Sequence, residues 1–356
     1  MKILQVIPYF CFGGAETMCE NLTYALKAQG HEVTVVSLFG EKTPISRRME
    51  EKNVRILYLD KKLGLDLSTV PKLKRIMEAE KPDVVHTHLN VIKYAAAAAR
   101  MAKVPKCVHT VHNVADQEAE GKIQKIINGF YFRRGWSVPV ALSPEVQSSI
   151  VSFYGLKEEQ VPIAYNGIDL SRCLPKERYS AGENFHILHI GRFNEQKNHA
   201  MLLRVFQKLA LENPNLRLDL IGDGELRLEI EGLAEALGIK EKVSFLGAQS
   251  NVYPYLHDAD LFLLPSRYEG MPMTLIEAMG TGLPIVATAV GGVPDMLKNG
   301  EDGITIPCEE DQIVDACKAL ISDEALRERI GRAARKSADR FSAQTMGERY
   351  LEIYTG

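Results

Sequence analysis

The chain has 356 residues, 46% of them apolar and 25% charged, ordinary values for a soluble globular protein. Its net charge of −3 argues against a general nucleic-acid-binding protein, so no nucleic acid is expected among its partners. No apolar run approaches the roughly 18–20 residues that span a bilayer, and no signal peptide is apparent. We therefore expect a cytoplasmic protein, either free or peripheral at the inner face of the plasma membrane.

The first half alternates short apolar runs with amphipathic stretches, a pattern typical of a parallel sheet covered on both faces. Candidate strands lie at 2–7, 32–38, 54–59, 83–88, 107–111, 138–142 and 161–165. Candidate helices lie at 15–29, 69–79, 91–102, 118–134 and 144–154.

The second half restarts this pattern after a polar, Pro-containing linker at 170–184. Its candidate strands lie at 185–190, 216–221, 242–246, 260–265, 284–288 and 303–307. Two doubly wound, Rossmann-like α/β domains are expected, over 1–170 and 171–342. Because ligands of such sheets bind beyond the carboxyl ends of the strands, functional residues are expected in the loops that follow the runs.

Three of these loops are rich in glycine and charge. "FGGAE" (12–16) opens a helix, and Gly13 and Gly14 allow backbone amides to approach a ligand, although a plain tight turn explains them equally well. "GRFNEQKN" (191–198) follows the first strand of the second half. There Arg192 and Lys197 suit a diphosphate, with two solvated surface cations as the alternative.

The next loop, "GDGELR" (222–227), is a second glycine-rich turn between a strand and a helix. Gly222 and Gly224 permit close approach to a bound nucleotide, and Asp223 either contacts the ligand or caps the following helix.

The segment "SRYEGMPMTLIEAMGTGLPIV" (266–286) places Glu269 and Glu277 around the start of a helix. The spacing predicts the second carboxylate about two helical turns beyond the first. Since a carboxylate accepts hydrogen bonds from paired hydroxyls, each glutamate suits one sugar ring. Two hydroxyl-rich rings joined by a diphosphate describe a nucleotide sugar.

These motifs, together with "TVHN", "YNGID", "IGDGE", "EAMGTGLPIVAT" and "GGVPDML", resemble glycosyltransferase family 4 over nearly the whole chain. The family consists of retaining enzymes of GT-B architecture, in which two Rossmann-like domains face each other across a cleft. The resemblance implies a retaining hexosyltransferase of cell-surface polysaccharide or glycolipid assembly. It also implies that the C-terminal helix, 343–356, returns to the first domain.

By the same resemblance, Glu277 holds the ribose, Glu269 the donor sugar, and Arg192 with Lys197 the diphosphate. His112 is placed near the reacting centre, so that the implied catalytic set is His112, Arg192, Lys197 and Glu269. The other implied donor-binding residues are Gly14, Gly191, Gly222, Gly224, Gly247, Gly270, Met271, Met273 and Thr274. Gly13 and His88 are assigned to the acceptor side.

No catalytic metal and no cofactor are expected, with a nucleoside-diphosphate sugar as co-substrate. The D-x-D sequence at Asp258 and Asp260 precedes a strand instead of ending one, so we interpret it as a helix-to-strand junction. Residues 247–252 carry no clear signature of uridine or guanosine, and between the two a UDP-sugar is favoured over a GDP-sugar.

The acceptor is expected to be a sugar, a glycolipid or a polyprenyl-linked sugar met by the first domain. Residues 1–170 carry 22 Lys and Arg against 18 Asp and Glu, whereas residues 171–356 carry 21 against 28. The segment "KIQKIINGFYFRRGW" (122–136) is basic with interspersed apolar residues and suits contact with an anionic membrane, although a packed helix with a solvated basic face fits as well.

Alternative functions on this architecture are a nucleotide-sugar epimerase, a sugar phosphorylase and, more distantly, a non-catalytic two-lobed binding protein. A binding protein has no need for clustered cations beside paired glutamates. A nicotinamide dehydrogenase is disfavoured because no glycine fingerprint is followed by the acidic residue that closes a later strand.

Overall fold

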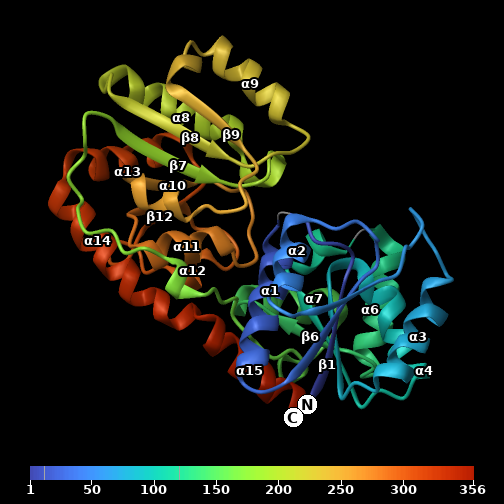
Figure 1. The fold of residues 1–356 in the computed structure, drawn as a ribbon. Coiled ribbons are helices and arrows are strands. Elements are labelled where there is room, and N and C mark those ends of the chain that lie inside the picture. Colours follow the sequence, from blue (N-terminus) through green and yellow to red (C-terminus); the bar gives the residue numbers. More distant parts are fainter. Residues whose placement is uncertain (12, 120) are drawn as a thin grey trace. The chain divides into compact units, whose positions relative to one another are not determined.

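The computed structural model describes residues 1–11, 13–119 and 121–356. The chain divides into two compact units, which are described one at a time (Figure 1). Unit 1 consists of residues 1–167 and 343–356, and unit 2 consists of residues 168–342.

Unit 1 contains a six-stranded sheet in the order β3-β2-β1-β4-β5-β6, and all its strand pairs are parallel. The strands are β1 (Lys2–Ile7), β2 (Glu32–Ser37), β3 (Arg55–Tyr58), β4 (Val84–His88), β5 (Lys106–Val111) and β6 (Val138–Ala141). The predicted strand at 161–165 is wrong: only Ile163 takes part, in an isolated bridge to Ala141.

The helices of unit 1 are α1 (Gly14–Ala28), α2 (Pro44–Glu51), α3 (Thr69–Glu80), α4 (Ile92–Met101), α5 (Ala115–Glu118), α6 (Gly121–Arg133), α7 (Pro144–Tyr154) and α15 (Ala343–Thr355). The predicted helix 118–134 corresponds to the end of α5 and to α6, and Glu120 lies outside the described residues. Helix α2 was not predicted, because its eight residues, "PISRRMEE", include only two apolar side chains besides Pro44, which are Ile45 and Met49.

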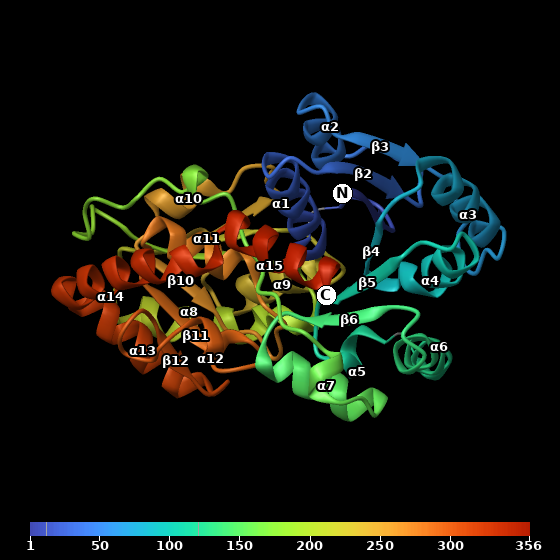
Figure 2. The ribbon, with the colours of Figure 1, turned by 90° about the horizontal axis from the view of Figure 1, so that it is seen from below.

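The C-terminal helix α15 packs beside α1 in unit 1 (Figure 2). Gly347 permits this contact, because a Cβ atom there would lie 3.0 Å from the Cβ of Ala25. Two buried tyrosines of α15 also bind the sheet. The hydroxyl of Tyr350 lies 2.7 Å from Thr110 Oγ1, and that of Tyr354 lies 2.7 Å from His86 Nδ1.

Unit 2 repeats the architecture with a parallel sheet in the order β12-β11-β10-β7-β8-β9. The strands are β7 (Phe185–Ile190), β8 (Leu216–Ile221), β9 (Val243–Gly247), β10 (Leu261–Leu264), β11 (Ile285–Thr288) and β12 (Ile304–Ile306). The helices are α8 (His199–Glu212), α9 (Arg227–Ala236), α10 (Tyr253–Asp258), α11 (Met273–Thr281), α12 (Val293–Met296), α13 (Glu310–Ser322) and α14 (Glu324–Ser337).

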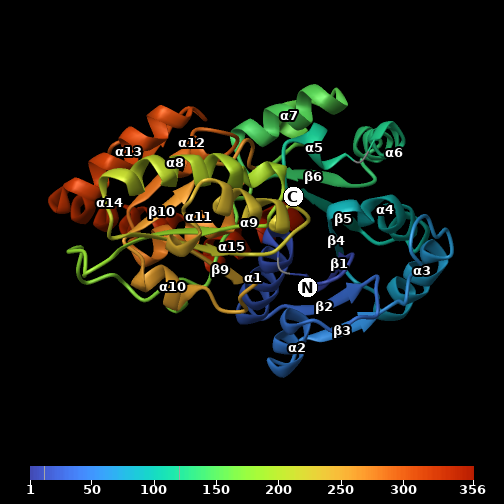
Figure 3. The same ribbon diagram turned by 90° about the horizontal axis from the view of Figure 1, so that it is seen from above.

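The two faces of this sheet carry different helices. Helices α8 and α13 lie side by side, whereas α11 packs against α10 and α14 (Figure 3). The strand order reverses between β7 and β10, which pair directly. The loops that follow these two strands therefore meet at the carboxyl edge of the sheet, where parallel α/β sheets bind ligands.

Candidate functional site

The loops after β7 and β10 join through a buried ion pair. Lys197 ends a 3₁₀ turn after β7, and its Nζ donates to Glu269 Oε1 at 2.6 Å. The two side chains are only 14% and 4% exposed. Gln196 Nε2 donates to the other carboxylate oxygen at 3.2 Å and to the Tyr268 carbonyl at 3.1 Å. Lys197 and Glu269, which the sequence assigned to the diphosphate and to the donor sugar, therefore form an ion pair with each other.

A third loop, after β11, packs on the backbone of Glu269. Gly291, after β11, has a φ of +55°, and a Cβ atom there would lie 1.6 Å from the carbonyl oxygen of Glu269. The next residue, Gly292, donates its N–H to the Gly270 carbonyl at 2.9 Å. The "GGVP" sequence therefore lets the backbone of one loop pack directly on the backbone of the other.

Glu277 lies inside α11 and is 8% exposed. Burial raises the pKa of its carboxyl to about 7, while the guanidinium of Arg172 and a hydrogen bond from Tyr253 act in the opposite direction. The spacing of the two glutamates does not represent two helical turns, because α11 begins only at Met273 and Glu269 lies in the preceding loop. Pro272 is accordingly the N-cap of α11 and does not belong to its first turn.

Arg192 has different surroundings from Lys197. Its side chain is 65% exposed, and NH2 donates to Glu225 Oε2 at 3.2 Å. The two cations predicted from one loop are therefore a buried, paired ammonium and a solvent-facing guanidinium. An exposed pair of this kind exchanges partners at little cost in free energy.

The glycines of these loops are required by loop-to-loop packing. A Cβ atom at Gly222, whose φ is +137°, would lie 2.0 Å from the Gly191 carbonyl oxygen. A Cβ atom at Gly224 would lie 2.4 Å from the Phe193 carbonyl oxygen. Gly222 also donates its N–H to the carbonyl of Gly247 at 2.9 Å. The sequence analysis predicted that Gly222 and Gly224 let the backbone approach a nucleotide. In the structure, the backbone of the loop after β7 already requires both glycines.

Two buried histidines beside Lys197 were missed. His189 Nδ1 donates to the Leu263 carbonyl at 2.8 Å, and the ring of His199 stacks on Phe193 with centroids 4.0 Å apart. Burial lowers the pKa of His189 to about 4 and that of His199 to about 2, so both rings are neutral at pH 7. His189 was not predicted as a site residue because the run "FHILHI", in which it lies, indicates only a strand.

The start of α11 contains further predicted donor-binding residues. Met271 and Met273 are 4% and 5% exposed, and both flank the N-cap of the helix. Thr274 Oγ1 is buried and finds no hydrogen-bond partner among the described residues. The Ser266 hydroxyl, in the loop after β10, is likewise buried and without a hydrogen-bond partner among the described residues. These hydroxyls can serve a polar ligand at this edge.

In unit 1, Gly13 is the N-cap of α1 and Gly14 its first residue. The carboxylate of Glu16 folds back over Gly13, where a Cβ atom would lie 2.4 Å from Glu16 Oε2. Because Oε2 is the far end of a flexible side chain, this contact alone does not require a glycine at position 13. Phe12, the first residue of the "FGGAE" motif, lies outside the described residues.

The expected acceptor contact of His88 does not fit its position. His88 is fully buried, and its two ring nitrogens pair with Gln5 and with His112. His112, directly after β5, is half-buried, and its backbone N–H donates to Glu118. Burial lowers the pKa of His112 to about 4. Of these two histidines, His112 is the one that can meet a ligand.

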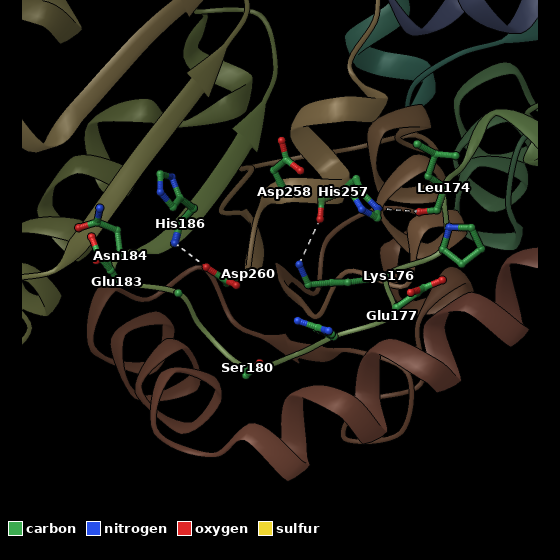
Figure 4. A pocket seen from close by; sticks show the side chains of 13 residues that line it. Leu174, Lys176, Glu177, Ser180, Glu183, Asn184, His186, His257, Asp258 and Asp260 are labelled. Carbon is green, nitrogen blue, oxygen red and sulfur yellow. Dashed lines mark hydrogen bonds between the residues drawn. The ribbon is translucent and has the colours of Figure 1, made fainter.

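The D-x-D sequence lies at the opposite, amino edge of the unit 2 sheet. Asp258 ends α10, and Asp260 precedes β10 and accepts a hydrogen bond from the backbone N–H of His186 at 2.9 Å, so the predicted helix-to-strand junction is confirmed. Both aspartates line a cavity of about 870 Å³, which Lys176 borders while donating to the His257 carbonyl (Figure 4). Among the described residues, no three His, Cys, Asp or Glu side chains gather as metal ligands would.

The family models match both halves of the chain. The model "Glycosyltransferase Family 4" matches residues 12–172, and the model "Glycosyl transferases group 1" matches residues 174–337. In the described part of the chain, helices of membrane-spanning length and hydropathy are absent.

Proteins of similar sequence include named sugar-transferring enzymes, consistent with the two family models. The N-acetyl-alpha-D-glucosaminyl L-malate synthase of Bacillus anthracis is 30% identical over 81% of this chain and 78% of that protein. The UDP-Gal:alpha-D-GlcNAc-diphosphoundecaprenol alpha-1,3-galactosyltransferase of Escherichia coli is 26% identical over 81% of this chain and 79% of that protein.

Among solved structures, Anabaena HepE in complex with UDP and glucose superposes with a TM-score of 0.87 at 20% identity, over 100% of both chains. A likeness at this identity concerns the fold alone, which is the two-domain GT-B fold. Together with the family matches and the Bacillus relative, it shows that this chain belongs to the family 4 glycosyltransferases of GT-B architecture.

Proposed function

We propose that the protein transfers a sugar from a nucleoside-diphosphate sugar to an acceptor hydroxyl, with retention of anomeric configuration and without a metal ion. The donor is a UDP-sugar in preference to a GDP-sugar, and the product belongs to a glycolipid or a polysaccharide. One observation carries the proposal: the buried Lys197–Glu269 pair lies beside the start of α11, the helix that contains Glu277.

The pair suits both halves of a nucleotide sugar. An ammonium group has three N–H donors, and the 2.6 Å contact with Glu269 uses one of them, so Lys197 can also bind phosphate oxygens. Glu269, held by Lys197 and Gln196, presents a fixed carboxylate to the hydroxyls of the donor sugar. Glu277 is proposed to accept from the ribose hydroxyls.

Arg192 completes the leaving-group site in this proposal. As the bond between the anomeric carbon and the diphosphate breaks, negative charge accumulates on the departing phosphate, and fixed cations stabilise it. We propose that Lys197 supplies a positioned charge and that Arg192, 65% exposed, moves onto the phosphate. The acceptor oxygen then bonds to the same face of the sugar and passes its proton to the departing phosphate.

Support for a UDP-sugar comes from similar proteins. HepE of Anabaena has been solved with UDP-glucose, and the Escherichia coli relative is named as a UDP-Gal transferase. The test is turnover with matched UDP- and GDP-sugars, with EDTA present and with early products analysed by NMR for anomeric configuration. Retained product formed from a UDP-sugar in EDTA is expected. Activity that EDTA abolishes and manganese restores would contradict metal independence.

A surface of unit 1 suits an acceptor carried by an anionic membrane. Its apolar side chains are between 41% and 90% exposed: Leu63, Leu65, Leu67, Ile123, Ile126 and Phe130. The leucines lie in the loop before α3 and the others on α6, and α4 lies between these two helices (Figure 2). Both segments touch α4, where Asp66 donates its N–H to the Tyr94 hydroxyl and Tyr131 donates to the Lys93 carbonyl.

Exposed lysines lie in the same two segments: Lys62 precedes Leu63, and Lys122 and Lys125 lie on α6. Each well-placed cation adds about 1 kcal/mol of attraction to an anionic leaflet, and salt screens it. The Escherichia coli relative is named for a diphosphoundecaprenol acceptor, which is a membrane lipid. We therefore propose that this surface, Leu63 to Leu67 with α6, rests on an anionic membrane.

Vesicle sedimentation tests the membrane contact. Changing Leu63, Leu65 and Leu67 to serine should reduce binding to anionic vesicles, as should Lys122→Gln with Lys125→Gln. The matched control changes Leu211 and Leu228 of unit 2, which are 82% and 83% exposed, to serine. If all these variants bind like the wild type, a soluble acceptor becomes the better interpretation.

A further inference from the structure

Three neighbouring strands of unit 1 carry a chain of buried polar side chains. Gln5 lies in β1, His88 ends β4, and His112 follows β5, with the strands adjacent in that order. Gln5, His88 and Thr23 of α1 are all 0% exposed. Because water does not reach these groups, each must satisfy its hydrogen-bonding atoms within the protein.

The direction of this chain is set at α1. The carbonyl oxygen of Cys19 only accepts, so the hydroxyl of Thr23 donates to it at 2.7 Å. With its proton used there, Thr23 Oγ1 accepts from Gln5 Nε2, also at 2.7 Å. The orientation of the Gln5 amide follows, since its N–H group must face Thr23.

The Gln5 oxygen therefore faces His88. Oε1 only accepts, so His88 Nε2, 2.9 Å away, carries the proton and donates it. Burial and the neighbouring histidines hold the pKa of His88 well below its usual range, so the ring is neutral at pH 7 and has one N–H. Its Nδ1 is consequently an acceptor.

The last step reaches His112. Its Nε2 lies 3.2 Å from His88 Nδ1, which has no proton to give. Since His112 is also neutral at pH 7, its one ring proton lies on Nε2, and the lone pair lies on Nδ1.

We infer that Thr23, Gln5 and His88 form a relay of fixed hydrogen-bond direction that selects the tautomer of His112. The relay holds the proton on Nε2, so that Nδ1 can only accept a hydrogen bond, and it accepts one from a sugar hydroxyl of a substrate. The second half of this inference rests on the proposed function, whereas the tautomer does not. Thr23, Gln5 and His88 are thus positioning residues, and only His112 touches the ligand.

The tautomer can be measured in the intact protein. Two-dimensional ¹⁵N–¹H correlation of histidine-labelled protein at pH 7.5 (roughly one unit above the ordinary histidine pKa) distinguishes Nε2–H from Nδ1–H, with His112 assigned from a His112→Asn variant. The wild type is expected to show Nε2–H at His112. An Nδ1–H tautomer, or an even mixture, would overturn the relay.

Thr23→Val tests the direction of the relay. Without the Thr23 hydroxyl, the Gln5 amide can turn and donate to His88, which moves the His88 proton to Nδ1 and the His112 proton to its own Nδ1. The matched control is Thr87→Val, because Thr87 is equally buried and bonds His109 at 2.8 Å, outside the relay. The His112 spectrum should change in the first variant alone. An unchanged spectrum in a folded Thr23→Val protein would contradict the inference.

The functional consequence is weaker recognition of that sugar hydroxyl. Once Nδ1 carries a proton, the hydroxyl must turn and accept instead of donating, so it gives up the partner that held it in that orientation. The loss of about one hydrogen bond corresponds to about a 3- to 10-fold fall in kcat/KM. Binding of free UDP, which has no sugar, should be unchanged in Thr23→Val. If the tautomer shifts but no substrate is ever turned over, the relay stands and the proposed transfer fails. If turnover is normal while the tautomer shifts, the contact with the sugar is wrong.

Discussion

Glu277 shows how one buried carboxyl makes folding stability depend on pH. Its folded-state pKa of about 7 lies above the 4.5 of an unperturbed glutamate, so its ionisation opposes folding. This cost is absent below about pH 4.5, grows as pH rises, and is complete above about pH 7. It amounts to roughly 3 kcal/mol at full ionisation. In the proposed function, ribose hydroxyls would give this buried carboxylate further hydrogen-bond partners and so offset part of that cost.

The variant Glu277→Gln should therefore be more stable than the wild type at pH 8 and equally stable at pH 4.5. Thermal unfolding at the two pH values measures this difference. The same variant should bind UDP more weakly, because an amide is a poorer acceptor for a ribose diol than a carboxylate is. Equal melting temperatures at pH 8 would show that the carboxyl is not buried as a charge.

Lys197 and Arg192 lie in one loop but should respond differently to substitution. Lys197→Met leaves the 4% exposed carboxylate of Glu269 without its counter-ion, which costs about 3 kcal/mol of folding free energy. Arg192→Met removes a largely exposed pair and should cost well under about 1 kcal/mol. Urea unfolding measures both, and Lys197→Met with Glu269→Gln should recover most of the loss. Equal destabilisation by the two single changes would rule out the buried pair.

At the scale of elements, the loops of unit 2 stabilise one another through backbone contact. The loop after β11 packs on the Glu269 peptide, and the loop after β8 packs on the loop after β7. The position of Glu269 thus depends on a glycine in another loop. Substitutions far from any ligand can for this reason disturb the candidate site.

Gly291→Ala tests this dependence. The new methyl group would overlap the Glu269 carbonyl oxygen, so the Glu269 loop should shift. Both the free energy of unfolding and the turnover rate should fall. Gly300→Ala is the control, because its φ of +75° imposes a similar left-handed backbone while no described atom lies within 4 Å. The control should cost about 1–2 kcal/mol and leave turnover unchanged. Similar activity of the two variants would argue that the Glu269 loop adapts.

At the scale of the molecule, unit 1 is completed by the last helix of the chain. Helix α15 covers α1 and supplies the hydroxyls that pair with His86 and Thr110. A buried polar group left without its partner costs about 1–3 kcal/mol, and the exposed face of α1 adds to that cost. Unit 1 is therefore assembled from both ends of the sequence.

Fragments of the chain test this assembly. Residues 1–167 alone should unfold without a cooperative transition, whereas the same fragment joined to residues 343–356 by a flexible linker should fold cooperatively. Circular dichroism during urea titration distinguishes the two. A third fragment with Tyr350→Ser and Tyr354→Ser serves as the control and should resemble the first. A stable 1–167 fragment would show that α15 is dispensable.

The sequence by itself determined the succession of strands and helices, because apolar runs with periods of two or 3.6 residues report local burial. It also placed Arg192, Lys197, Glu269 and Glu277 after the correct strands, because doubly wound sheets collect such loops at one edge. Local periodicity failed at 161–165, where an apolar run forms only one bridge, and at α2, which has only eight residues and too few apolar side chains to mark a helix.

Tertiary structure alone decided which of these residues meet. Lys197 and Glu269 are 72 residues apart, and their pairing follows from the adjacency of β7 and β10 at the point where strand order reverses. The glycine contacts and the relay through Gln5 to His88, 83 residues away, likewise depend on strand order. The physical reason is that hydrogen bonds and buried charges are satisfied between neighbours in space, and no local pattern in the chain records which neighbours the sheet will bring together.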